Sequence, residues 1–195
     1  MHTYGDEFST ASAREVLPVI FNVIGTPNSV IDIGCGIATW LSVCNDLGVM
    51  EITGLDGSHV QSTGQLLISD DDFIPVDFER IEKIKIKRKY DFLMSLEVAE
   101  HLQEKSADQF IGLLSSLSNI ILFSAAIPGQ TGMNHFNEQY PEYWQKKFDK
   151  YGFQFFDIRN IFWGNNNIDW WYRQNMFLVA NKAGAGKLEN FFSTW

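Results

Sequence analysis

The stretch VIDIGCGIATW, residues 30–40, contains the pattern that decides the fold. Apolar residues lead to an acid, Asp32, and then to Gly34 and Gly36, after which the chain continues into an apolar stretch. This order predicts a buried strand, a tight turn and a helix. Glycine tolerates the positive φ angles of such a turn, and its missing Cβ lets a ligand lie against the backbone. The stretch therefore predicts a loop that binds a flat, polar ligand.

The spacing of the glycines separates two kinds of nucleotide ligand. The dinucleotide pattern G-x-G-x-x-G, which holds a pyrophosphate on helix N-terminal amides, requires glycine where this chain has Thr39. A dehydrogenase is therefore disfavoured. The acid followed by G-x-G over residues 32–36 instead resembles the first motif of class I S-adenosylmethionine-dependent methyltransferases, with Ala38 in the place of a third small residue.

Acidic residues end three further predicted strands. These strands span residues 50–56, 73–78 and 90–96. Asp56 lies twenty residues after Gly36, at the spacing where a carboxylate accepts hydrogen bonds from ribose hydroxyls. Asp77 and Phe78 could hydrogen-bond and stack an adenine, and Glu97 follows the last of these strands. The order of these features extends the resemblance to about residues 1–180.

The resemblance implies a Rossmann-like α/β domain over residues 1–182. It implies a seven-stranded, mostly parallel sheet in the order 3-2-1-4-5-7-6, with the last strand antiparallel and helices on both faces. Residues 183–195 show no period and are expected to form a loosely held tail.

Residues 124–140 are similar to a small group of stand-alone bacterial methyltransferases tied to glycan or secondary-metabolite modification. That similarity makes Tyr4, Asp6 and Arg14 candidates for a lid over the cofactor. The residues expected to hold S-adenosylmethionine are Tyr4, Arg14, Asp32, Gly34, Cys35, Gly36, Asp56, Gly57, Asp77, Phe78, Leu96 and Glu97.

The sequence EVAEH at residues 97–101 raises the question of a metal. In a helical turn, Glu97, Glu100 and His101 would lie on one side and could bind Mg²⁺ or Mn²⁺. The stretch is similar to the E-x-x-E-H sequence of ubiquinone-biosynthesis O-methyltransferases and small-RNA 2′-O-methyltransferases, and this similarity implies His135 as a further ligand. Alternatively, Glu97 contacts the cofactor, Glu100 and His101 are solvated, and His135 is a lone general base. The catalytic candidates are His135 and Glu97.

Composition bounds the class of protein. The chain has 195 residues, 45% of them hydrophobic, which is enough for one domain with one core. Its two cysteines, Cys35 and Cys44, predict free thiols in a reducing, cytoplasmic location. We find neither a secretion signal nor an apolar run long enough to span a membrane. The net charge of −9 makes nucleic acid an improbable partner, and the sequence favours no oligomeric state.

Three local segments carry further expectations. Residues 80–89 hold six of the 15 Lys and Arg residues, and their alternation with Ile predicts an exposed edge strand or hairpin, or else a site for a phosphorylated substrate. The aromatic residues at 162–172 either cap the rim of the core or wall a substrate pocket. Ser12 and Glu15 have the spacing of a capping box.

Together these features predict methyl transfer from S-adenosylmethionine to an oxygen of a small-molecule, sugar or glycan acceptor. Two alternatives are a metal-dependent RNA 2′-O-methyltransferase and a non-catalytic S-adenosylmethionine-binding partner subunit.

Overall fold

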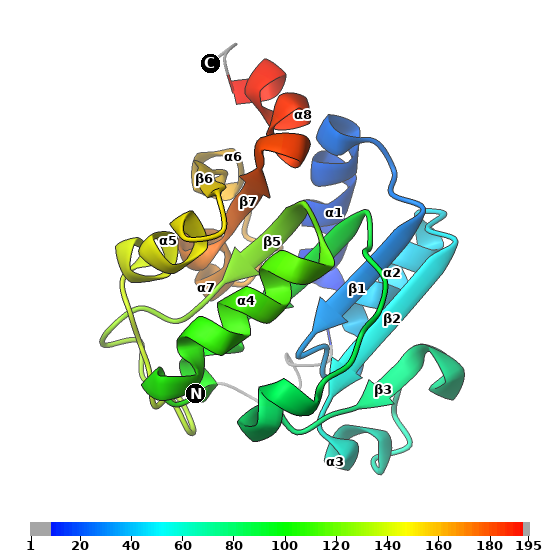
Figure 1. Cartoon of the computed structure of the whole chain (residues 1–195). Helices are drawn as coiled ribbons and strands as arrows, with labels where there is room; N and C mark the ends of the chain where they lie inside the picture. The colour runs from blue at the N-terminus through cyan, green and yellow to red at the C-terminus, as the bar shows by residue number, and fades with distance from the viewer. Residues whose placement is uncertain (1–8, 193–195) are drawn as a thin grey trace.

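Seven strands form one sheet in the order β3-β2-β1-β4-β5-β7-β6 (Figure 1). The structure is a computed structural model that describes residues 9–192. The strands are β1 (Ser29–Ile33), β2 (Glu51–Asp56), β3 (Phe73–Pro75), β4 (Phe92–Leu96), β5 (Ile120–Ser124), β6 (Phe153–Asp157) and β7 (Phe177–Asn181). Strands β1 to β5 are parallel, whereas β7 runs antiparallel to both β5 and β6. The predicted strand order and the antiparallel last strand are confirmed.

The helices alternate with the strands along the chain. They are α1 (Ala11–Ile24), α2 (Thr39–Asp46), α3 (Ser58–Gln61), α4 (Ala107–Leu117), α5 (Pro141–Asp149), α6 (Arg159–Phe162), α7 (Trp170–Asn175) and α8 (Lys182–Phe192). Four short 3₁₀ turns are η1 (Asp70–Asp72), η2 (Phe78–Lys83), η3 (Ala99–His101) and η4 (Glu104–Ser106). In the part of the chain that the structure describes, no helix has the length and apolar character needed to cross a bilayer.

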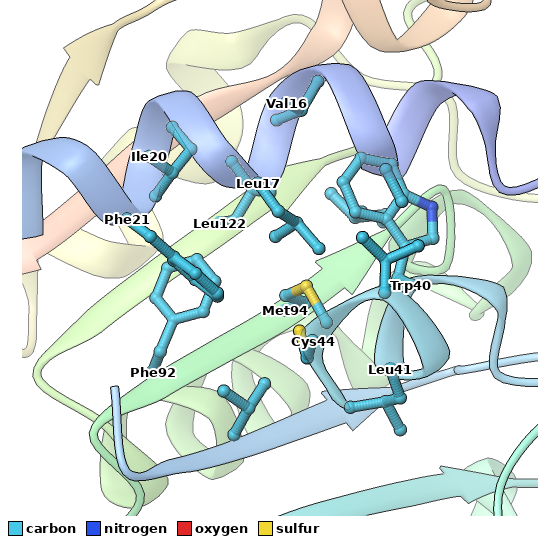
Figure 2. Packing of buried hydrophobic residues seen from close by; sticks show 14 of the residues in the cluster. Val16, Leu17, Ile20, Phe21, Trp40, Leu41, Cys44, Phe92, Met94 and Leu122 are labelled. Atoms are coloured by element: carbon cyan, nitrogen blue, oxygen red, sulfur yellow. The ribbon is translucent and has the colours of Figure 1, made fainter. Parts of the chain in front are cut away.

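Both faces of the sheet are buried. Because successive side chains of a strand point to opposite sides, each strand contributes to two cores. Val30 joins the core under α1, α2 and α8, whereas its neighbour Ile31 joins the core under α4 and α5. Figure 2 shows the first of these cores, where Leu17 of α1 lies over Met94 of β4 and Phe21 packs against Phe92. Helices cover both faces of the sheet, as predicted (Figure 1).

The C-terminal segment forms a helix rather than the expected loose tail. In α8, Ala185 and Leu188 are buried in the core that includes α1. Gly184 allows this close packing, since a Cβ there would lie 2.4 Å from the carbonyl oxygen of Asn119. The prediction for residues 183–195 is therefore wrong over α8. Ala185 and Leu188 alone do not reveal a helical period in the sequence.

The basic segment does not form the predicted edge strand or hairpin. Residues 80–83 belong to η2, and residues 84–89 have no strand pairing. Ile84 and Ile86 pack partly against the core while Lys83, Lys85 and Lys87 are exposed, so the alternation reflects burial without a strand. The edge strands of the sheet are β3 and β6 instead.

The N-terminal capping-box prediction is also wrong. Helix α1 starts at Ala11, which places Ser12 inside the helix. The Ser12 hydroxyl donates to Oδ2 of Asp169 at 2.6 Å and accepts from the amide of Asp169 at 3.0 Å. Glu15 accepts hydrogen bonds from Asn165 and Asn167. These two side chains therefore fasten the segment before α7 to α1.

Candidate functional site

The loop between β1 and α2 bends sharply over its glycines. Gly34 and Gly36 have φ angles of 84° and 53°, and Ala38, at 67°, is the N-cap of α2. A Cβ on Gly34 would lie 2.3 Å from a methyl of Val98, so only glycine fits. The amides of Gly34 and Cys35 both donate to the carbonyl of Leu55, at 2.7 and 3.1 Å. The loop is thereby fixed against the end of β2.

Asp56 connects the glycine loop to the end of β2. Its Oδ2 accepts a hydrogen bond from the amide of Gly36 at 2.7 Å, and its Oδ1 accepts one from the amide of Gly57 at 2.6 Å. The structure therefore places Asp56 beside the glycine loop. Its contact with a ribose stays a prediction.

Three buried groups lie under this loop. Asp32 is 3% exposed, and burial, with the nearby charge of Asp56, raises the pKa of its carboxyl well above the usual range. Burial also raises the pKa values of the Cys35 and Cys44 thiols, and the nearby charge of Asp32 raises them further. Both cysteines are free and buried. Since the thiolate is the reactive form, these thiols are inert fillers of the core.

The residues predicted to hold an adenine lie after β3. The Asp77 carboxylate caps η2 by accepting from the amide of Glu79 at 2.9 Å. Phe78 is half-buried, with its ring edge against Phe110 at 6.2 Å between centroids. Phe78 therefore anchors η2 to α4, and adenine stacking on it stays a prediction.

Arg14, the lid candidate among the described residues, does not lie at the glycine loop. Arg14 forms a salt bridge of 2.7 Å with Asp46, the last residue of α2, whereas the glycine loop precedes the first. An eight-residue helix separates its ends by about 10 Å. Tyr4 and Asp6 lie outside the described residues.

The chain leaves β4 through Leu96, which is buried, and turns at Glu97. Glu97 has a φ of 55°, which is rare for a residue with a side chain. Its amide donates to both the carbonyl and the hydroxyl oxygen of Ser124, at 3.1 Å each. The structure thus holds Glu97 in a left-handed conformation at the carboxyl edge of the sheet, where backbone strain often accompanies function.

Asn175 fixes the side chain of Glu97. Its Nδ2 lies 3.2 Å from each Glu97 carboxylate oxygen and 3.0 Å from Oε1 of Gln130. Burial raises the pKa of Glu97, while hydrogen bonds from Ser124 and Asn175 act in the opposite direction. Neither Gln130 nor Asn175 was predicted as a site residue, because each follows no motif and reaches Glu97 only through folding.

Glu100, His101 and His135 form a cluster beside Glu97. One potential ligand atom from each lies within 4.8 Å of the others. Glu100 is fully buried, and its two carboxylate oxygens have no hydrogen-bond partner among the described residues. Burial, with the nearby Glu97, raises the pKa of Glu100 to about 8. An uncompensated carboxylate of this kind is costly to bury unless a proton or a cation neutralises it.

The structure brings three of the four predicted metal ligands together. Glu100, His101 and His135 offer atoms within 4.8 Å of one another, whereas Glu97, beside Glu100, lies outside that group and accepts from Asn175. The four-ligand set stays a prediction. A 3₁₀ turn has three residues per turn, so the α-helical spacing on which that prediction depended does not apply.

Hydrogen bonds orient the two imidazoles. Nδ1 of His135 lies 2.8 Å from Oε1 of Glu138, and Nδ1 of His101 lies 3.3 Å from the carbonyl of Asn134. Both partners are acceptors, so each Nδ1 carries the proton and each Nε2 keeps a free lone pair. Burial, and then the nearby His135, lowers the pKa of His101. Two imidazoles and a buried carboxylate match the ligands of a divalent cation.

The loop that carries His135 is tied to η3. The amides of Phe136 and Asn137 donate to the carbonyl of Glu100, at 2.8 and 2.9 Å. Glu138 accepts from the amide of Gly129 at 2.9 Å through its second oxygen. A Cβ on Gly132 would lie 2.2 Å from Nε2 of His135. The ring of His135 therefore needs glycine at position 132.

Comparisons with known proteins identify the family of the chain. The sequence model of a family described as "Methyltransferase domain" matches residues 6–166. A ubiquinone biosynthesis O-methyltransferase of Rhodopseudomonas palustris (strain HaA2) is 27% identical over 89 residues. The match covers 45% of this chain and 34% of the relative, so this chain matches about a third of that protein.

Solved structures share the fold. Magnesium protoporphyrin IX methyltransferase of Synechocystis PCC 6803, with bound SAH, has a TM-score of 0.65 and 15% identity, covering 93% of this chain and 89% of that chain. A SAM-dependent methyltransferase of Archaeoglobus fulgidus has a TM-score of 0.63 and 19% identity, covering 92% and 98%.

Proposed function

This chain belongs to the family of methyltransferase domains, and from that premise we propose that it methylates an oxygen of a small molecule or sugar with S-adenosylmethionine as donor. The observation that best supports this proposal is the hydrogen bond between the Gly36 amide and the Asp56 carboxylate. It joins the glycine loop to the acid expected to hold a ribose, at the edge of a parallel sheet where ligands of such folds bind.

The cofactor would lie over the glycine loop, between the ends of β1, β2 and β4. Gly34 and Gly36 offer bare backbone, and Asp56 keeps unused lone pairs for ribose hydroxyls. Asp77, Phe78 and Leu96 line the ends of the neighbouring strands. S-adenosylmethionine supplies the electrophilic methyl group, so the protein is required chiefly to orient the two reactants and exclude water.

His135 is the proposed general base. Its Nδ1–H donates to Glu138, which leaves the Nε2 lone pair to accept the proton of an acceptor hydroxyl. The hydroxyl oxygen would then form the new bond to the methyl carbon as the bond from that carbon to sulfur breaks. Glu138 would stabilise the resulting imidazolium, and Glu97, held by Asn175, would orient the acceptor or cofactor.

A divalent cation is a second proposed component. Glu100, His101 and His135 would hold Mg²⁺ or Mn²⁺, which would lower the pKa of a bound acceptor hydroxyl. His135 would then be a ligand rather than the base.

The end of the basic segment lies away from the proposed site, which supports a small acceptor over RNA. Arg88 pairs with Glu51 at the start of β2, and Lys89 contacts Asn119 just before β5. Both lie at the amino edge of the sheet, whereas Glu97 and His135 lie at the carboxyl edge. The cations nearest the end of this segment therefore do not border the proposed site.

Two measurements test this function. Calorimetric titration should show saturable binding of S-adenosylmethionine and none of NAD. Incubation of the purified chain with S-adenosylmethionine and a pool of hydroxyl compounds should yield S-adenosylhomocysteine. Binding of NAD alone would contradict the proposal, and cofactor binding without turnover on any acceptor would favour the non-catalytic partner subunit.

A further inference from the structure

A cavity lies at the carboxyl edge of the sheet, beyond β5. It has a volume of about 310 Å³ and lies between the start of α5 and the strands β6 and β7. Ile127, Phe155 and Phe177 supply its apolar wall. The sheet order places it on the far side of β4 and β5 from the glycine loop after β1. The cavity is thus separate from the cofactor loop but shares an edge of the sheet with it.

A fixed guanidinium forms part of the wall. The Arg159 guanidinium lies over the ring of Phe177, 4.6 Å from its centroid. It donates to the two carboxylate oxygens of Asp157 at 2.9 and 2.6 Å, and to the carbonyl of Gln174 at 3.4 Å. Arginine has five N–H groups, so two have no partner among the described residues. These two remain for a ligand.

The other polar residues of the cavity are a glutamate, two glutamines and Tyr140. Glu142, Gln145 and Gln174 line it, and their side chains make no hydrogen bond within the described residues. Since Asp157 already neutralises Arg159, Glu142 makes the local charge negative. An anionic ligand would be repelled. A hydroxyl, by contrast, can accept from the guanidinium and donate to the carboxylate or the amides.

The combination of walls matches one ligand class. Phe155 and Phe177 offer apolar faces for the carbon side of a ring, while the polar side chains surround them with donors and acceptors. The volume is near the small end of the range for ligand pockets, about 300–1,000 Å³. The cavity therefore suits one uncharged, hydroxylated ring rather than a polymer.

Hydrogen bonds link this cavity to the proposed site. The amide of Ile127 donates to Oε1 of Gln130 at 2.6 Å, and the same oxygen accepts from Asn175. Asn175 in turn donates to Glu97, and it directly follows the lining residue Gln174. One layer of side chains therefore separates the cavity wall from Glu97.

We propose that the cavity lined by Phe155, Arg159 and Phe177 binds an uncharged, hydroxylated ring of the methyl acceptor. This inference rests on the proposed function, because it assigns the ring to the acceptor. A substituent of that ring would have to pass around the layer formed by Gln130 and Asn175 to reach Glu97.

Amide spectra of the isotopically labelled full chain test the proposal, with methyl α-D-glucopyranoside as the neutral ring and benzoate as an anionic, apolar ring. The glucoside should give saturable shifts at Ile127, Phe155 and Phe177. Gln145→Ala, whose side chain is exposed, and Gln174→Ala should each weaken its affinity about fivefold, the loss of one hydrogen bond. Gln154→Ala, an exposed residue of β6 outside the cavity, should leave the affinity unchanged.

Three results would overturn the proposal: stronger binding of benzoate, equal weakening by all three variants, or no saturable shift with the glucoside at its solubility limit. Titration of S-adenosylmethionine into the same sample separates the two proposals. A chain that binds the glucoside at these residues but ignores the cofactor keeps the ring site and loses the methyltransferase assignment.

Discussion

The amide of Gly36 donates a 2.7 Å hydrogen bond to the carboxylate of Asp56, which lies twenty residues later in the chain. The same carboxylate accepts from Gly57 at 2.6 Å. Asp56 therefore shapes the glycine loop before any ligand arrives, and the proposed ribose contact would add to this role. A loop that is already bent requires less ordering when a cofactor binds.

Replacement of Asp56 should weaken cofactor binding. Asp56→Ala removes the acceptor of the Gly36 amide together with the proposed ribose contact, so the affinity for S-adenosylmethionine should fall by roughly 1–3 kcal/mol. Asp56→Asn keeps one acceptor oxygen and should lose less. Calorimetry measures both, with the exposed Asp70→Ala as the control. Wild-type affinity in Asp56→Ala would refute the assignment.

Asn175 should contribute measurably to stability. It is 3% exposed and donates toward Glu97 and Gln130. Asn175→Ala leaves their buried oxygens without this donor, which should cost about 1–3 kcal/mol of unfolding free energy. Urea unfolding provides the measurement. Asn160→Ala, at an exposed position, should change it by less than about 0.5 kcal/mol; an equal effect at both positions would contradict the role of Asn175.

Metal binding should depend on Glu100 and not on Glu97. Only Glu100 belongs to the cluster with His101 and His135. In a Mn²⁺ titration followed by electron paramagnetic resonance, Glu100→Gln should lose at least about tenfold in affinity, within the range seen when metal-site partners are removed. Glu97→Gln should stay close to the wild type. A larger loss of Mn²⁺ affinity in Glu97→Gln than in Glu100→Gln would support Glu97 as a ligand. Absence of Mn²⁺ binding by the wild type would contradict the metal proposal.

The position of the His135 ring should depend on glycine at position 132. Gly132→Ala places a Cβ 2.2 Å from Nε2 of His135 and must displace the ring or the loop, at a typical cost of about 1–3 kcal/mol. Methyl transfer should fall while the affinity for S-adenosylmethionine stays unchanged. Gly164→Ala, where a Cβ meets nothing within 4 Å, is the matched control. A fully active Gly132→Ala enzyme would show that the position of His135 is unimportant.

Glu100 should make stability depend on pH. Its pKa in the folded chain is about 8, raised from 4.5, so between these values the folded state binds more protons than the unfolded state. Its contribution is therefore complete below about pH 4.5 and is lost as the pH rises through 8, by an amount on the order of a few kcal/mol. Unfolding in the presence of a chelator should show this loss. Glu100→Gln should show a flatter profile, and an identical slope in both proteins would contradict it.

Several features follow from the sequence alone. Gly34 and Gly36 have positive φ angles, which glycine tolerates, and Asp56 follows them at a characteristic spacing. The strand, the turn and the carboxylate could therefore be predicted from local pattern. The order of the strands came from family resemblance, since spacing does not determine which strands pair. The alternation of Ile and Lys at 83–87 predicted burial correctly and secondary structure wrongly.

Only the tertiary structure decided the composition of the site. Glu97 contacts Asn175, 78 residues away, and Ser12 contacts Asp169, 157 residues away. The cluster of Glu100, His101 and His135 leaves Glu97 outside, although Glu97 lies only three residues before Glu100 in the sequence. Turn and burial preferences act over a few residues and can be recognised in the sequence. Contacts between distant side chains depend on how the helices and strands pack, which no local pattern records.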